Sequence, residues 1–118
     1  MGKDTLIVKI GSESLKDFGT SEKVQSLIEN IAKRKHEGTQ ILLVSSGAVQ
    51  FGRDHSTGIE NKQVLAAVGW PYLISDYARR FAEQNIGVAS FLVTHADIED
   101  SRDRARTFIE TIQATWDA

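Results

Sequence analysis

Two short apolar runs, each followed at once by a turn of small residues, constrain the fold of this chain most strongly. Residues 6–10, apart from Lys9, and residues 41–44 are aliphatic and rich in β-branched side chains, as buried strands are. Between them, apolar side chains recur at three- and four-residue spacing, which predicts an amphipathic helix that is capped by Ser21 and ends at Gly38. A strand, a helix and a strand in this order predict a βαβ unit with two parallel strands.

A second helical stretch, residues 61–84, has a broad apolar face and contains Pro71. Because proline has no amide hydrogen, it should kink this helix or start a new one. Residues 88–93 form a third predicted strand, and a final helix follows, with apolar side chains at helical spacing as far as Trp116.

These elements predict an α/β fold, a three-layer α/β/α sandwich with a mainly parallel sheet, in one domain that spans residues 1–118. Parallel strands are covered on both faces in such folds. The predicted sheet is also unfinished, because three strands leave apolar edges that natural folds extend or cover. We therefore expect a truncated domain.

Composition excludes several classes of protein. The 118 residues are 41% apolar and 25% charged, as in an ordinary soluble globular domain. The absence of cysteine excludes disulfides and a thiol nucleophile, and makes a cytoplasmic location the default expectation. A net charge of −2 without a basic cluster argues against nucleic acid as a partner, and no run approaches the ~18 apolar residues of a membrane span.

The turns after the first two strands are the candidate functional site, because ligands of open parallel sheets bind beyond the carboxyl ends of the strands. Residues 9–12, the first turn, combine Lys9 with a glycine that lets backbone amides approach an anion. Residues 45–48, the serine turn, offer hydroxyls and amides at a predicted helix N-terminus. Each pattern also fits an ordinary turn or a simple helix cap.

No residues are assigned to a metal site. The three histidines lie in different segments without ligand spacing, and the acidic residues between 97 and 103 alternate with arginines at the start of a helix, where acids complement the helix dipole. The common nucleotide-binding patterns are absent as well. A nucleotide site in this chain must use another architecture.

Four sequence blocks, taken in order, resemble the amino-acid kinase family, and specifically its glutamate 5-kinase type. They are VKIGSESL, VSSGAVQFG, NKQVLAAVG and FLVTHAD, and they extend over almost the whole chain. The second and third blocks are the most discriminating, because other members of the family share the lysine and glycine at the first strand end but differ later.

The resemblance implies a reaction and a set of roles. Such enzymes transfer the γ-phosphoryl group of ATP, with Mg²⁺, to the side-chain carboxylate of glutamate in the first step of proline biosynthesis. By motif matching, Lys9 is the catalytic residue and contacts the ATP phosphates together with Gly11 and Ser12. Ser46, Gly47 and Ala48 hold glutamate. Glutamate and ATP are then the small-molecule ligands, and a homo-oligomer is expected.

The sequence also departs from the family pattern. Glu13 stands where a small residue is usual, and Trp70 stands where a glutamine is usual. The family continues beyond the position of Ala118 into an acidic segment that completes the glutamate site and then into the nucleotide-binding half, so we expect this chain to be the glutamate-binding half alone. The alternative is a non-catalytic carboxylate-binding or oligomerisation module derived from such a kinase.

Overall fold

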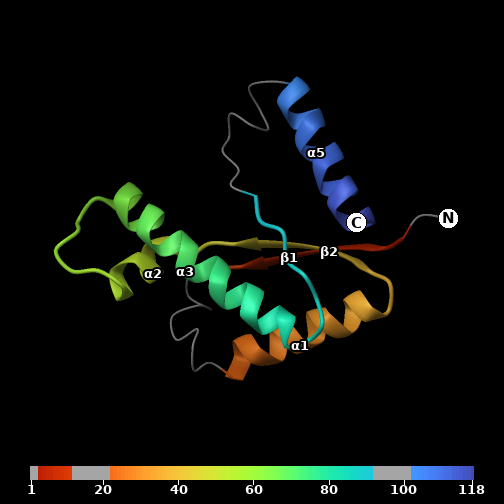
Figure 1. Cartoon of the computed structure of the whole chain (residues 1–118), viewed down its shortest axis with the longest axis horizontal. Coiled ribbons are helices and arrows are strands. Elements are labelled where there is room, and N and C mark those ends of the chain that lie inside the picture. The colour runs from red at the N-terminus through yellow and green to blue at the C-terminus, as the bar shows by residue number, and fades with distance from the viewer. Residues whose placement is uncertain (1–2, 12–21, 92–101) are drawn as a thin grey trace. The chain divides into compact units, whose positions relative to one another are not determined.

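The computed structural model describes residues 3–11, 22–91 and 102–118. Its elements, shown in Figure 1, are β1 (Thr5–Ile10), α1 (Glu22–His36), β2 (Gln40–Ser45), α2 (Ala48–Asp54), α3 (Lys62–Ala82) and α5 (Arg102–Asp117). They fall into two compact units, Met1–Val88 and Ala89–Ala118, which are described separately below. None of the helices in these described ranges is long and apolar enough to cross a membrane.

The two predicted N-terminal strands pair in parallel, which confirms both strands and their relative direction. Their register runs from Thr5 opposite Gln40 to Ile10 opposite Ser45. Because side chains alternate between the faces of a strand, this register sorts them into two sets. The inner face carries Leu6, Val8, Ile10, Ile41, Leu43 and Ser45, and the outer face carries Thr5, Ile7, Lys9, Leu42 and Val44.

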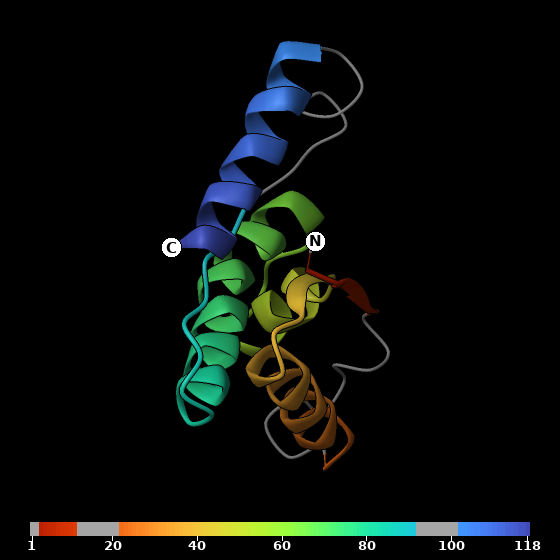
Figure 2. The same cartoon turned by 90° about the vertical axis from the view of Figure 1, so that its right-hand side faces the viewer.

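The inner face forms the core of the first unit with α1, α2 and α3, and Figure 2 shows α1 and α3 on the same side of the two strands. The buried side chains of this core come from β1, α1, α2 and α3; they are Ile10, Val24, Ile28, Ile31, Phe51, Leu73, Tyr77 and Phe81. The outer face is different, because Ile7 remains 64% exposed and Val44 46% exposed. A sheet covered on both faces is therefore not seen in the described residues.

Helix α1 ends as the sequence predicts, at Gly38. This glycine has a φ of +103°, a left-handed conformation that side chains with a Cβ rarely adopt. Its N–H donates to the carbonyl of Lys35, and the N–H of Thr39 donates to that of Arg34, the two bonds of a Schellman motif. The turn satisfies carbonyls that the helix would otherwise leave without intrahelical partners. The predicted cap, Ser21, lies outside the described residues.

Helix α3 begins after Asn61, whose side-chain oxygen accepts hydrogen bonds from the amides of Gln63 and Val64 at 2.9 and 3.2 Å. It is a single helix through Pro71, so the alternative that a new helix begins at the proline is wrong. The proline withholds a hydrogen bond from the carbonyl of Ala67. Ala67 is exposed, so water can solvate that carbonyl and the helix continues.

The predicted third strand does not form in the part of it that is described. Residues 86–91 have no regular secondary structure, and residues 92 and 93 lie outside the described residues. Strand preference depends on packing against a sheet face, and here Val88 is 42% exposed.

In the second unit the predicted final helix is confirmed as α5, and the ring of Phe91 meets that of Phe108 edge to face at 5.8 Å between centroids.

Candidate functional site

The two candidate turns meet at the carboxyl ends of the paired strands. The amide of Ser46 donates a 3.1 Å hydrogen bond to the carbonyl of Ile10, the last residue of β1. This bond continues the ladder between the strands by one step beyond their last paired residues, Ile10 and Ser45. The serine turn is therefore attached to the residue that precedes Gly11, as the parallel arrangement predicts.

The serine turn leads directly into α2, as the sequence predicts. Gly47 is the N-cap residue of this helix and has a φ of +113°. Glycine suits this position because a Cβ is strongly disfavoured at such an angle. Gly47 itself makes no side-chain cap hydrogen bond.

The Ser45 hydroxyl instead links the serine turn to α3. Its oxygen lies 2.8 Å from the hydroxyl oxygen of Tyr77 and 2.9 Å from the carbonyl oxygen of Ser46. Tyr77 is 3% exposed, and burial raises the pKa of its phenol above the ordinary value. The phenol therefore stays protonated at neutral pH.

Two glycines allow α2 and α3 to cross in close contact directly behind the serine turn. A Cβ on Gly69 of α3 would lie 1.8 Å from the carbonyl oxygen of Ala48 and 2.3 Å from the amide nitrogen of Gly52. A Cβ on Gly52 would lie 2.0 Å from the carbonyl oxygen of Leu65. Both glycines come from the two most discriminating sequence blocks, and their joint role was missed because spacing alone does not show which residues meet.

The residues of the first turn are only partly described. Lys9 lies on the outer face and is exposed. Gly11 is partly exposed, and a Cβ there would meet no atom within 4 Å, so the space around its backbone is open. Ser12 and Glu13 lie outside the described residues. The structure thus brings Gly11 close in space to the serine turn, because the preceding residue, Ile10, is bonded to Ser46. Lys9 stands on the opposite face of the sheet from the core.

The two described histidines, His36 and His55, make their hydrogen bonds with the backbone. His36 Nε2 lies 2.8 Å from the carbonyl oxygen of Gln84, and His55 Nδ1 lies 2.8 Å from that of Phe51. The ring of His55 also stacks on Tyr72, with 3.7 Å between centroids. Within residues 3–11, 22–91 and 102–118, no three histidine or acidic side chains gather where they could hold a metal ion.

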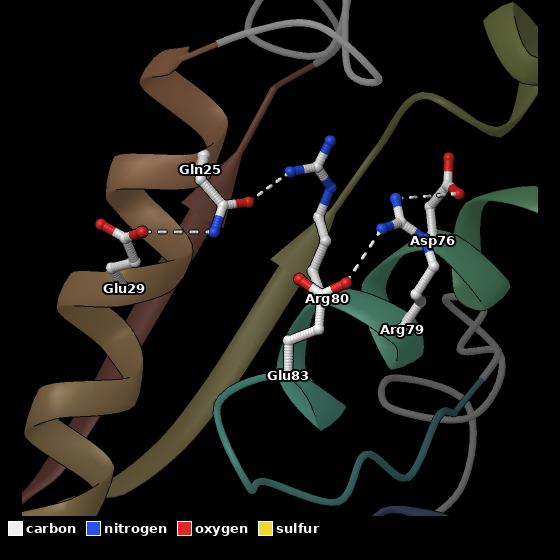
Figure 3. Close-up of polar contacts among 6 residues, drawn as sticks. All are labelled: Gln25, Glu29, Asp76, Arg79, Arg80 and Glu83. Atoms are coloured by element: carbon white, nitrogen blue, oxygen red, sulfur yellow. Dashed lines mark hydrogen bonds and ion pairs between the residues drawn. The ribbon is translucent and has the colours of Figure 1, made fainter.

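A buried arginine links α3 to α1, and sequence patterns did not indicate it. Arg80 is 5% exposed, and its Nη1 donates a 2.5 Å hydrogen bond to Oε1 of Gln25, whose amide donates in turn to Glu29 (Figure 3). The neighbouring Arg79 pairs with Asp76 and Glu83 at the surface. Exposed ion pairs of that kind contribute little to stability. The buried hydrogen bond of Arg80, which involves a charged group, is stronger and helps to orient α3 against α1.

No protein-family model matches the chain. Almost the whole chain is nevertheless similar to one part of larger proteins of the kinase class. These relatives are named glutamate 5-kinase. The chain is 34% identical to the one from Haemophilus influenzae strain PittEE over 99% of its length, 36% identical to that of Photorhabdus laumondii over 96%, and 37% identical to that of Proteus mirabilis over 96%.

The chain spans about a third of the length of these curated relatives, 34% of the first and 33% of the other two. The resemblance to glutamate 5-kinase, inferred above from four sequence blocks, is thereby confirmed, as is its partial extent. The similarity covers nearly all of the chain, so both units described here take part in it.

Proposed function

We propose that this chain is the glutamate-binding half of an amino-acid-kinase domain of the glutamate 5-kinase type. The complete fold would be a three-layer α/β/α sandwich, in which further strands extend β1 and β2. Its reaction would be the ATP-dependent phosphorylation of the glutamate side-chain carboxylate to glutamyl phosphate, the first step of proline biosynthesis. The observation that carries this proposal is the hydrogen bond from Ser46 to Ile10, which joins the two turns proposed to bind anions at the carboxyl ends of the strands.

The serine turn is the proposed glutamate site. The hydroxyl of Ser46 can donate to a carboxylate, and the amides of Gly47 and Ala48 lie at the start of α2, whose N-cap residue is a glycine. Ser46 is exposed, so a ligand can reach its side chain. These groups hold the substrate in place, which is the main task of the protein in phosphoryl transfer.

The first turn is the proposed phosphate contact. ATP supplies the phosphoryl group to be transferred, and repulsion between its phosphates and the glutamate carboxylate is offset by cations and oriented amides. The residues present fit this role in part: Lys9 is an exposed cation, and the open space at Gly11 admits an anion to the backbone. Ser12 would add a hydroxyl. Mg²⁺, which the resemblance implies, would help to offset the charge of the phosphates.

Turnover would require more than this chain. The curated relatives are about three times as long, and in the proposal their remaining length contributes the adenine site and the rest of the glutamate site. Groups that act together on one reaction lose most of their effect when some are missing. The proposed setting is the cytoplasm, in a homo-oligomer.

Titration with L-glutamate, followed by ¹⁵N NMR, tests the binding role. We expect the amides of residues 46–48 to shift, and Ser46→Ala to weaken binding about tenfold, the effect of losing a hydrogen bond to a charged group. Ser26→Ala, which removes an exposed serine on α1, is the matched control. Lys9→Ala should leave glutamate binding unchanged and weaken ATP binding, with Lys23→Ala as its control. Glutamate shifts that avoid the serine turn would contradict the proposal.

A second candidate function, a non-catalytic binding or oligomerisation module, is favoured by one observation. The outer face leaves Ile7 and Val44 largely exposed, and Tyr72 on α3 is 46% exposed. A coupled assay of ATP consumption with glutamate separates the two functions. Turnover that is abolished by Lys9→Ala would exclude the module, whereas glutamate binding without turnover, even with the remaining kinase residues supplied as a second chain, would exclude the enzyme.

A further inference from the structure

We propose that Tyr77 is a positioning residue for the glutamate site: through Ser45 it fixes the orientation of the Ser46–Gly47 peptide. The inference rests on the proposed function for its ligand, and on hydrogen-bond geometry for the positioning itself. Tyr77 lies 31 residues beyond Ser46, in the middle of α3, and does not contact the ligand in this proposal.

The direction of the hydrogen bonds follows from the available hydrogens. Ser45 has one hydroxyl hydrogen, and that hydrogen is donated to the carbonyl oxygen of Ser46 at 2.9 Å. The Ser45 oxygen can then only accept in its 2.8 Å contact with Tyr77. Tyr77 is therefore the donor, and the chain of bonds runs from its phenol through Ser45 to the carbonyl of Ser46.

Fixing this carbonyl fixes an amide as well. The peptide bond is planar and trans, so the carbonyl of Ser46 and the N–H of Gly47 point in opposite directions from one rigid plane. The preceding peptide is held too, because the Ser46 amide donates to Ile10. Both peptides that flank Ser46 are thus anchored, and the Gly47 amide and the Ser46 side chain are oriented before a ligand arrives.

The surroundings of Tyr77 suit a permanent donor. Its side chain is 3% exposed, and its ring stacks near that of Phe81 with 6.5 Å between centroids. Burial disfavours the phenolate and raises the pKa, so the hydroxyl keeps its hydrogen at all physiological pH values. Phenylalanine would preserve this packing and remove only the donor.

The test combines Tyr77→Phe, Ser45→Ala and the double variant with L-glutamate as the probe. We expect each single variant to weaken glutamate binding about fivefold, which corresponds to one neutral buried hydrogen bond, and to shift the Gly47 amide resonance in the absence of ligand. The double variant should bind no more weakly than either single variant, because both changes break the same chain. Tyr72→Phe, which removes an exposed phenol from the same helix, should change neither measurement.

Thermal stability distinguishes positioning from a general loss of structure. Each single variant removes one partner of the hydrogen bond between Ser45 and Tyr77 and should melt lower, whereas the double variant removes both groups and should recover part of that loss. Glutamate affinity should not recover with it. If affinity followed the melting temperature across the three variants, the effect would be structural and the inference would be overturned.

Failure of the proposed function gives a different result. If the unaltered chain bound no glutamate, the ligand would be wrong, but a Gly47 amide that shifted in both single variants would still support the positioning role. If glutamate bound normally to Tyr77→Phe and the Gly47 amide stayed in place, Tyr77 would not position the turn, and the proposed function would stand.

Discussion

At the scale of single residues, the serine turn depends on side chains that do not belong to it. Ser45 uses its hydroxyl to connect the turn with Tyr77 rather than to cap α2. The glycine at position 47 makes the left-handed start of that helix possible. Each of these residues has a role that its own sequence motif indicates only in part.

The buried phenol of Tyr77 predicts a dependence of stability on alkaline pH. Its folded pKa is raised by burial, while in the unfolded chain it is near 10. Below about pH 10 the phenol is protonated in both the folded and the unfolded state, and its contribution to the free energy of unfolding is fully present. As the pH rises further, the unfolded state releases its proton first, so the free energy of unfolding falls until the folded pKa is passed, by at most about 1.4 kcal/mol per pH unit.

Urea denaturation of the unaltered chain and of Tyr77→Phe at pH 8 and at pH 11 measures this effect. We expect the difference in stability between the two proteins to shift in favour of Tyr77→Phe at the higher pH. Tyr72→Phe controls for the loss of an exposed phenol. Equal pH dependence in all three proteins would mean that Tyr77 is solvated.

Sequence reasoning located the turns but not the residues that support them. Lys9, Ser46 and Gly47 were predicted as site residues because they directly follow or end apolar runs, a local pattern that a single sequence displays. The contact of Ser45 with Tyr77 joins residues 32 positions apart. Nothing local marks such a pair, because a buried tyrosine on a helix face has the spacing of any core residue.

At the scale of elements, the crossing of α2 and α3 sets the position of the serine turn. Helices normally lie 8–10 Å apart, but here the missing side chains of Gly52 and Gly69 let backbone meet backbone. The first carbonyl of α2, that of Ala48, lies directly against Gly69. Any displacement of this crossing therefore moves the start of α2 and the turn before it.

Gly69→Ala tests this dependence. The added Cβ would overlap the Ala48 carbonyl oxygen, which is backbone and cannot rotate away, so we expect the free energy of unfolding to fall by about 3 kcal/mol. Gly87→Ala is the matched control, since a Cβ there meets no atom within 4 Å and its stability should change by less than about 1 kcal/mol. Urea denaturation gives both values. Equal stability of the two variants would show that the helices can separate without cost.

The success of prediction differed between elements for a physical reason. The strands β1 and β2 and the helices α1, α3 and α5 were predicted because each has its own apolar periodicity and end residues. The strand expected at residues 88–93 has a similar apolar pattern, but residues 86–91 lie outside any sheet. A strand needs a neighbour to pair with, and a local pattern does not say whether one is present.

At the scale of the whole molecule, the outer face of the sheet is an apolar surface that the first unit leaves uncovered. Ile7 is exposed on β1 and Val44 on β2, and Lys9 stands on the same face. Parallel strands are normally covered on both faces. Burial of this face against a second copy of the chain would agree with the second candidate function, an oligomerisation module, because helices would cover it in the proposed three-layer sandwich.

We expect Ile7→Thr to weaken self-association about thirtyfold, since it removes roughly 1 kcal/mol of apolar contact from each protomer and therefore about 2 kcal/mol from a dimer. Threonine keeps the branched Cβ that strands favour, and stability should change by less than about 0.5 kcal/mol at so exposed a position. Sedimentation velocity over a range of concentrations measures the association. Val64→Thr alters an exposed apolar residue on α3 and is the control. An unchanged association constant for Ile7→Thr would exclude this face as the interface.

The hydrogen bond between Ser46 and Ile10 also bears on when the serine turn can form during protein synthesis. Every described residue that supports the serine turn, from Ile10 through Gly52 and Gly69 to Tyr77, belongs to the first unit. During synthesis, N-terminal units fold first. On a ribosome the turn can therefore assemble as soon as α3 has emerged, and a nascent chain would already hold its carboxylate-binding geometry while later residues are still being translated.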